Sequence, residues 1–93
     1  MNKPMRKGSD FERKIVNNAL SLGLKAHRNR VSRAIPGESW DVEIAGKRLE
    51  AKKRKAGFKK LTEWIQGNDG VVVGADREQP LVVVRLQDYL KML

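Results

Sequence analysis

The chain has 93 residues and a formal net charge of +9, with no cysteine and one histidine. This length predicts one domain with a single hydrophobic core, and the lack of cysteine excludes disulfides, thiolate zinc sites and cysteine nucleophiles. One histidine is too few for an imidazole zinc site, so carboxylates are the expected ligands of any metal. The basic excess indicates a polyanionic partner. No apolar run reaches the length of a membrane span and no signal peptide is recognisable, so we expect a cytoplasmic protein without a membrane partner.

The N-terminal segment predicts a basic arm and then a helix. Residues 1–8 are rich in basic side chains and contain one proline and one glycine, so we expect a flexible basic arm before a folded domain over residues 9–93. Ser9 and Glu12 have the spacing of a capping box, in which the serine side chain accepts a hydrogen bond from a free amide at a helix start. Apolar residues at helical spacing continue as far as Gly23, which is expected to end the helix.

A short strand, a long loop and a β-hairpin are expected next. The strand is predicted over residues 24–28, and residues 29–39 show no periodicity, which predicts a loop long enough to indicate a functional role. Apolar and polar residues then alternate over residues 40–53. Gly46 and Lys47 fit the two central positions of a hairpin turn within that segment.

This turn would fix which hairpin residues lie opposite each other. Asp41 would face Lys52, and Glu43 would face Glu50. Carboxylates placed directly opposite repel each other, and a divalent cation beside them would relieve that repulsion. One face of the hairpin would be polar, and the other would belong to the core through Val42, Ile44, Leu49 and Ala51.

The C-terminal half predicts a helix, two strands and a last helix. The first of these helices is expected to begin near Phe58 and to end near Gly67. Residues 71–73 and 81–84 are apolar runs of strand length, expected to be covered on both faces, and the last helix is expected from about Gln87. The resulting order, α-β-β-β-α-β-β-α, predicts a single-domain α/β fold in which helices flank a mixed central β-sheet.

The polar face of the hairpin carries groups suited to phosphodiester hydrolysis. Asp41 and Glu50 would hold Mg²⁺, or Mn²⁺ in its place, which would polarise a phosphate and activate a water. Lys52 would orient or help deprotonate that water, or stabilise charge on the phosphate. Glu12 would add a third carboxylate, although the capping box explains it equally well, and Glu43 is expected to be a solvated neighbour. The plain alternative is a hairpin face that only contacts water.

The order of these residues resembles that of a known nuclease core. An aspartate followed on the next strand by Glu50-Ala51-Lys52, after a helix bearing Glu12, is similar to the PD-(D/E)xK nucleases. The opening Lys7-Gly8-Ser9-Asp10-Phe11-Glu12-Arg13 resembles the start of the archaeal-type Holliday junction resolvases, and the element order extends the likeness over nearly the whole chain. The resemblance implies a restriction-endonuclease-like fold and a Mg²⁺-dependent endodeoxyribonuclease. It also implies a homodimer that cuts branched DNA, four-way junctions in particular.

The same resemblance implies further site residues. The family's catalytic groups correspond here to Lys52 and to three metal-binding carboxylates, Glu12, Asp41 and Glu50. A serine in the loop before the aspartate assists cleavage in the family, and Ser32 is the candidate here, with Ser39 as the alternative. The chain departs from the family at Trp40, where many members have proline, and it is shorter than typical members.

Basic residues around the predicted site are expected to contact DNA phosphates. They are Lys7, Arg28, Arg30, Arg33, Lys53, Arg54 and Lys55. Two other functions fit the same residues. One is a DNA-binding module that keeps this fold without cleavage, and the other is a related nuclease that nicks DNA, trims flaps or cuts RNA.

Overall fold

The computed structural model describes residues 3–29 and 40–93, with the side chains of the first helix described from residue 8 onward. The predicted order of elements is confirmed, and the class is mixed α/β. Contacts divide the chain into two compact units, Met1–Lys53 together with Leu93, and Arg54–Met92. The elements are α1 (Lys3–Ser21), β1 (Ala26–Arg28), β2 (Val42–Ile44), β3 (Lys47–Leu49), α2 (Lys59–Trp64), β4 (Gly70–Val73), β5 (Leu81–Val84) and α3 (Leu86–Lys91).

Helix α1 begins earlier than the sequence predicts. It begins at Lys3, so Pro4 lies in the first turn, where a proline removes no helical hydrogen bond. Residues 3–8 are therefore helical, although the sequence assigned them to an arm. Ser9 lies inside the helix, and the prediction that it forms a capping box with Glu12 is wrong.

The C-terminal end of α1 is where the sequence predicts it. Gly23 has φ +80°, its amide donates to the carbonyl of Leu20 at 2.9 Å, and the amide of Leu24 donates to the carbonyl of Ala19 at 3.1 Å. This pair of bonds is a Schellman motif, which satisfies the last carbonyls of the helix. A residue with a Cβ atom would be strained at this φ, so glycine is required here.

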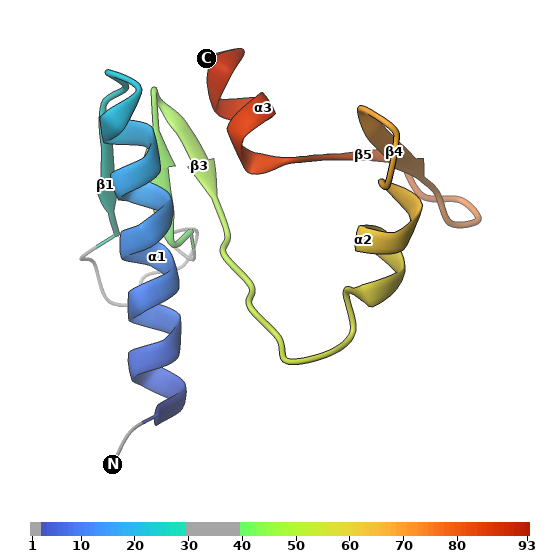
Figure 1. Cartoon of the computed structure of the whole chain (residues 1–93), viewed down its shortest axis with the longest axis horizontal. Coiled ribbons are helices and arrows are strands. Elements are labelled where there is room, and N and C mark those ends of the chain that lie inside the picture. The colour runs from blue at the N-terminus through green and yellow to red at the C-terminus, as the bar shows by residue number, and fades with distance from the viewer. Residues whose placement is uncertain (1–2, 30–39) are drawn as a thin grey trace. The chain divides into compact units, whose positions relative to one another are not determined.

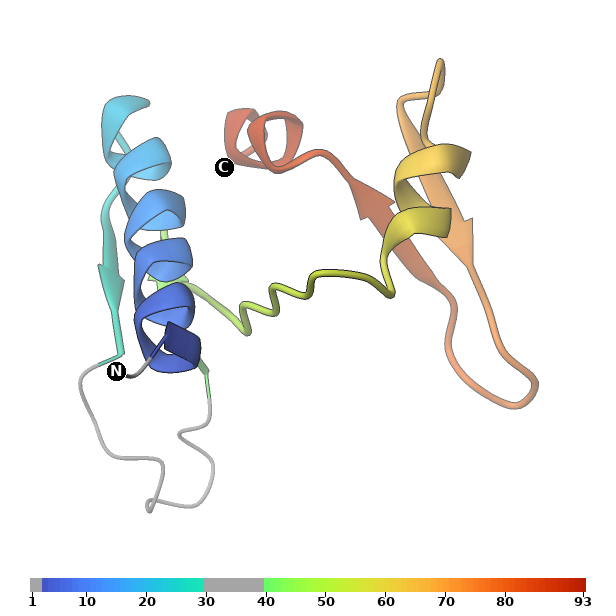
Figure 2. The ribbon, with the colours of Figure 1, turned by 60° about the horizontal axis from the view of Figure 1, so that its bottom comes forward.

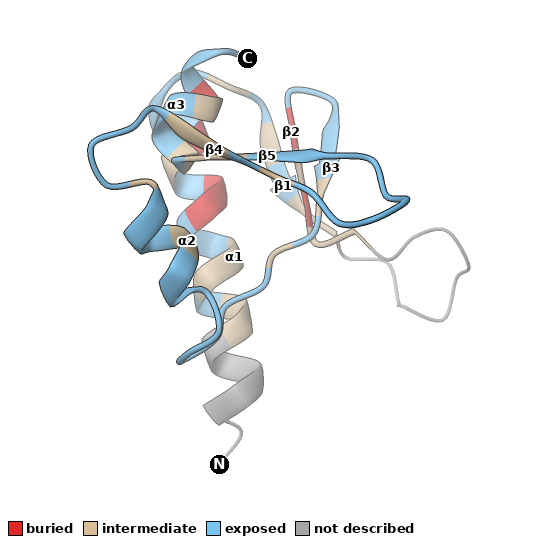
Figure 3. Ribbon diagram, turned by 90° about the vertical axis from the view of Figure 1, so that its right-hand side faces the viewer, coloured by how far each residue is buried: buried red, intermediate tan, exposed pale blue. Residues whose placement is uncertain are grey.

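The core of the first unit lies between α1 and an antiparallel sheet with the strand order β1-β2-β3 (Figure 1). Ile15, Val16 and Ala19 lie on one stripe of α1 and are buried. Val42 and Ile44, which alternate with a polar residue along β2, are buried as well; the red segments of α1 and β2 in Figure 3 include these residues. Burying an aliphatic side chain of this size stabilises the fold by about 1.5–3 kcal/mol.

The turn between β2 and β3 is shifted by one residue from its predicted position. Ala45 and Gly46 have φ values of +50° and +82°, which are the positive values that both central residues of a type I′ turn require. The prediction of Gly46 and Lys47 as the central residues is therefore wrong. Alanine in this left-handed conformation costs about 1–2 kcal/mol. The flanking strands offset that cost by burying Val42 and Ile44.

The shifted turn changes the hairpin partners and leaves the faces unchanged. The register pairs Val42 with Leu49, Glu43 with Arg48 and Ile44 with Lys47. It differs from the predicted register by two residues, and side chains alternate with a period of two, so Leu49 stays on the side of the sheet that Val42 occupies. Glu43 faces Arg48 instead of Glu50, and the predicted pair of opposed carboxylates, Glu43 and Glu50, is wrong.

The second unit contains a separate antiparallel sheet made of β4 and β5, which Figure 2 shows as a long hairpin. The strands of the described residues thus form two antiparallel sheets, and the predicted single mixed sheet is not observed. Val72 is 73% exposed, and Leu81 and Val82 are also exposed, so the prediction that both faces of these strands are covered is wrong. Two strands alone offer too little surface to cover their own apolar side chains.

Candidate functional site

Asp41 lies directly before β2, and backbone hydrogen bonds fix its position. Its amide donates to the carbonyl of Leu49 at 2.9 Å, while the Cα partner of Leu49 is Val42. Two successive residues therefore face Leu49, which is the arrangement of a β-bulge, a device that redirects a side chain. The carbonyl of Asp41 accepts a hydrogen bond of 2.9 Å from the amide of Asn29, which follows β1.

The carboxylate of Asp41 contacts the segment Glu50-Ala51-Lys52, called the E-x-K segment from here on. Its Oδ2 atom accepts a hydrogen bond of 2.6 Å from the backbone amide of Ala51, in a part-buried position. Hydrogen bonds to an ionised carboxylate are short and about twice as strong as neutral ones. The predicted register, in which Asp41 faces Lys52, is wrong, and the contact of the Asp41 carboxylate is with the backbone of Ala51 between Glu50 and Lys52.

Glu50 and Lys52 form an exposed ion pair within the E-x-K segment. The Lys52 Nζ atom lies 3.5 Å from the Glu50 Oε1 atom, and both side chains are 59% exposed. A surface pair of this kind contributes about 0–1 kcal/mol. Both groups are therefore accessible to a ligand, and little energy opposes their rearrangement.

Glu12 is held by Arg28 at the end of β1. The Arg28 Nε atom donates to the Glu12 Oε1 atom at 3.0 Å, and Arg28 Nη2 donates to the Ser9 hydroxyl at 3.2 Å. The Glu12 side chain is 16% exposed and that of Arg28 is 32% exposed. Because Ser9 and Glu12 lie one turn apart on α1, a single guanidinium reaches both. The Glu12 carboxylate thus neutralises Arg28 rather than capping a helix.

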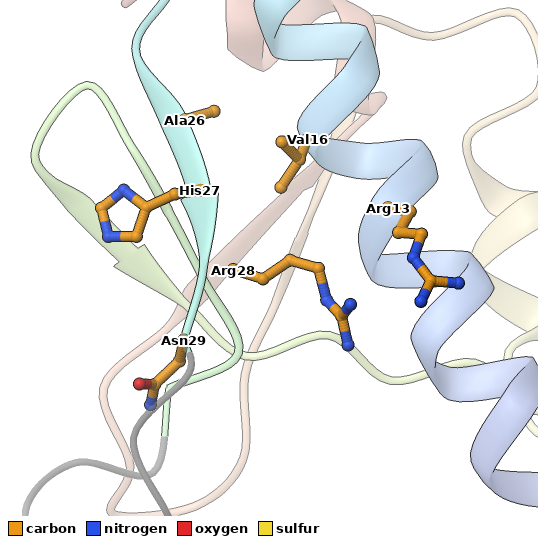
Figure 4. A pocket seen from close by; sticks show the side chains of 6 residues that line it. All are labelled: Arg13, Val16, Ala26, His27, Arg28 and Asn29. Carbon is orange, nitrogen blue, oxygen red and sulfur yellow. The ribbon is translucent and has the colours of Figure 1, made fainter.

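A pocket opens between α1 and β1, next to this ion pair (Figure 4). In Figure 4 the side chain of Arg28 extends from the strand toward the helix, while His27 points away from the helix. Arg13 is paired with Asp10 at 3.3 Å, so each of these two arginines has an acidic partner. The residues lining the pocket are Arg13, Val16, Ala26, His27, Arg28 and Asn29.

Trp40, the residue before Asp41, packs with residues of neighbouring strands. Its ring makes an edge contact with His27 at 5.8 Å between centroids, and the Arg48 guanidinium lies 5.1 Å from the ring centroid. Arg48 also bonds Glu43 through its Nε atom at 3.3 Å. These contacts fix the backbone that leads into Asp41, and they pair Glu43 with a cation inside the sheet.

The remaining predicted residues are not gathered at one place. Lys53 lies over the ring of Phe11, with its Nζ atom 5.6 Å from the centroid, whereas Arg54 and Lys55 are exposed. Lys7 belongs to α1, and its side chain lies outside the described part of the structure. The predicted residues that fall wholly outside the described part are Arg30, Ser32, Arg33 and Ser39.

Asn29 is a residue of this site that the sequence analysis missed. Its Nδ2 atom donates to the carbonyl of Trp40 at 2.8 Å, while its amide bonds Asp41. The sequence places Asn29 at the start of a loop, where asparagine is common for local reasons. No local pattern signals a bond to a residue on another strand.

No group of three acidic or histidine side chains that could hold a metal ion is present among the described residues, so Glu12 is not grouped with Asp41 and Glu50. None of the helices in this part of the chain combines the length and apolar character needed to cross a bilayer. A scan against protein-family models and searches of curated proteins and of solved structures give no match to this chain.

Proposed function

We propose that the protein is a metal-dependent DNA endonuclease of the PD-(D/E)xK type. The observation that carries this proposal is the 2.6 Å hydrogen bond between the Asp41 carboxylate and the amide of Ala51. This bond joins the aspartate of the motif to the middle of the E-x-K segment. The β2–β3 hairpin brings the two positions together, and the hydrogen bond turns the Asp41 carboxylate toward the E-x-K segment.

The carboxylates of Asp41 and Glu50 are the proposed ligands of a magnesium ion. Mg²⁺ prefers carboxylate oxygens, usually takes only one or two of them from the protein, and keeps several of its waters. When bound, the ion supplies charge stabilisation at the phosphate and an activated water. Glu12 is assigned to its ion pair with Arg28 and not to the metal, because these three carboxylates do not form a group.

Lys52 is the proposed cationic partner of the reaction. Its ammonium group lies 3.5 Å from Glu50 and is exposed, so it can reach a phosphate that approaches the same carboxylate. A fixed positive charge at that place stabilises the additional negative charge of the transition state. The neighbouring hydrogen bond to Ala51 limits the movement of the segment that carries Lys52.

DNA is the proposed substrate. The net charge of +9 favours a phosphate backbone, and Arg54 and Lys55, which follow the E-x-K segment in the sequence, are exposed. The preference for four-way junctions and the homodimer rest on the sequence resemblance. Two opposed cuts require two sites, which a two-fold dimer would supply. Light scattering tests the dimer, and competition between a junction and linear duplex tests the preference.

The test of the proposal is cleavage of a panel of four-way, flap and linear duplex DNA by the purified protein. Cleavage is expected with Mg²⁺ or Mn²⁺, none with EDTA, and binding without turnover with Ca²⁺. Absence of cleavage with every metal and substrate would overturn the proposal.

A DNA-binding module without cleavage is the second candidate. The ion pair between Glu12 and Arg28 favours it, because the carboxylate that the resemblance assigns to metal already has a cationic partner. The affinity of the module for DNA would fall steeply with salt, as that of the nuclease would, and the module would not bind Mn²⁺. Titration of Mn²⁺ against the protein without DNA distinguishes the two candidates.

A further inference from the structure

Asn29 contacts the chain on both sides of the peptide bond between Trp40 and Asp41. Its side-chain amide donates to the Trp40 carbonyl at 2.8 Å, and its backbone amide donates to the Asp41 carbonyl at 2.9 Å. One residue thus binds two consecutive carbonyls of a neighbouring strand. The backbone bond continues the ladder of β1 and β2, while the side-chain bond lies outside the ladder.

Two further bonds act on Asp41 from the other strand. Its amide donates to Leu49 at 2.9 Å, and its carboxylate accepts from Ala51 at 2.6 Å. The carboxylate direction therefore depends on how the bulge is held. The Trp40 carbonyl lies in the same planar peptide group as the Asp41 amide. The Asn29 side chain therefore holds this peptide group through a hydrogen bond that a substitution can remove.

We infer that Asn29 is a positioning residue: its side-chain amide sets the orientation of the Asp41 carboxylate against the E-x-K segment and so determines metal affinity. This inference rests on the proposed function in one respect, the binding of metal by Asp41 and Glu50. Groups that orient metal ligands through hydrogen bonds typically contribute a factor of roughly 10–100 in metal affinity. Asn29 itself supplies no atom to the metal.

The test compares three substitutions in the full chain. Asn29→Leu keeps the shape of the side chain and removes its donor. Asn29→His places a ring N–H donor at the same distance along the side chain. Asn68→Leu is the matched control, because the Asn68 side-chain amide also donates to a tryptophan carbonyl, that of Trp64 at 3.0 Å, in the turn after α2.

Two readouts are needed, neither of which is catalytic activity. The first is the NMR position of the Ala51 amide proton, which reports the bond to Asp41 directly. In Asn29→Leu it is expected to move toward its position in Asp41→Asn, and in Asn68→Leu it should stay at the wild-type position. The second is the Mn²⁺ dissociation constant measured by electron paramagnetic resonance. It is expected to rise roughly tenfold or more in Asn29→Leu, to recover in Asn29→His and to stay unchanged in Asn68→Leu.

An unchanged Ala51 signal in Asn29→Leu overturns the inference, and so does an unchanged Mn²⁺ affinity where the wild type binds Mn²⁺. If Asn29→Leu does not fold, as judged by circular dichroism, Asn29→Ser replaces it, since the shorter hydroxyl cannot reach the Trp40 carbonyl. Failure of the proposed function gives a different result: the wild type itself then binds no Mn²⁺. In that case the Ala51 signal alone decides whether Asn29 orients Asp41.

Discussion

The backbone amide of Ala51 donates a hydrogen bond of 2.6 Å to the carboxylate of Asp41. Ala51 carries no chemically active side chain, but it lies between Glu50 and Lys52. Its backbone amide therefore links Asp41 to the segment that carries both residues. The E-x-K segment forms no strand in the structure. The bond to Asp41 therefore holds a segment that no strand pairing holds. The positions of Glu50 and Lys52 thus depend on Asp41, and replacing Asp41 should affect both the proposed metal site and the segment.

Removal of either carboxylate should abolish cleavage. Asp41→Asn and Glu50→Gln keep side-chain shape and remove a negative charge, so the single-turnover rate in Mg²⁺ is expected to fall by roughly a hundredfold or more. DNA affinity in Ca²⁺ should change little. Glu43→Gln is the matched control, because Glu43 lies in the same hairpin and is paired with Arg48 at 3.3 Å. Wild-type rates in the Asp41 or Glu50 variant would remove that residue from the site.

Replacement of Lys52 should slow the reaction, whereas replacement of Lys53 should weaken binding. Lys52→Met removes the charge next to Glu50, and we expect a lower single-turnover rate at saturating protein with nearly unchanged DNA affinity. Lys53→Met should leave that rate unchanged, lower the affinity and reduce the salt dependence by about one unit of slope. A lower DNA affinity with an unchanged single-turnover rate in Lys52→Met would identify Lys52 as a phosphate contact only.

Features with a local cause were predictable from the sequence. Gly23 ends α1 because a left-handed residue is needed there, and Val42 and Ile44 are buried because they alternate with a polar residue along a strand. Motif order likewise led to Asp41 and Glu50 as candidate metal ligands, which stays a prediction. These inferences need only neighbours along the chain.

Features set by distant contacts were not predictable. Ser9 and Glu12 have the spacing of a capping box, but Arg28 from β1 binds both and the helix continues past them toward the N-terminus. The sequence allowed two central pairs for the hairpin turn, Ala45-Gly46 and Gly46-Lys47. In the structure Ala45 and Gly46 form the turn, although alanine is strained at positive φ. In this structure β2 packs against α1, and that contact lies outside the hairpin sequence.

The position of the turn can be tested by stability. Ala45→Asn should stabilise the protein by about 0.5–1 kcal/mol, because asparagine tolerates positive φ and Asn-Gly is a favoured type I′ turn. Lys47→Asn is the control: Lys47 pairs with Ile44 in a strand, where asparagine is unfavourable, so this variant should be destabilised. Urea midpoints at unchanged m-values measure both effects. If Lys47→Asn stabilised the protein and Ala45→Asn destabilised it, the central residues of the turn would be Gly46 and Lys47 instead.

The last prediction concerns the ion pair between Glu12 and Arg28, which joins α1 to β1. Its side chains are 16% and 32% exposed, so it lies between a surface pair and a buried pair, and we expect a coupling free energy of about 1 kcal/mol. A double-mutant cycle with Glu12→Gln and Arg28→Met, followed by urea unfolding, measures it.

The pair between Asp10 and Arg13 is the control for this cycle. It lies on the same helix at 3.3 Å with side chains 63% and 60% exposed, and its coupling should be near zero because solvent screens it. Repeating both cycles in Mg²⁺ separates the two roles of Glu12. Because Glu12 is not grouped with Asp41 and Glu50, its coupling to Arg28 should be the same with and without the ion. A coupling that disappears in Mg²⁺, while that of the control pair does not change, would show that Glu12 leaves Arg28 to bind the metal, as the resemblance to the resolvases implies.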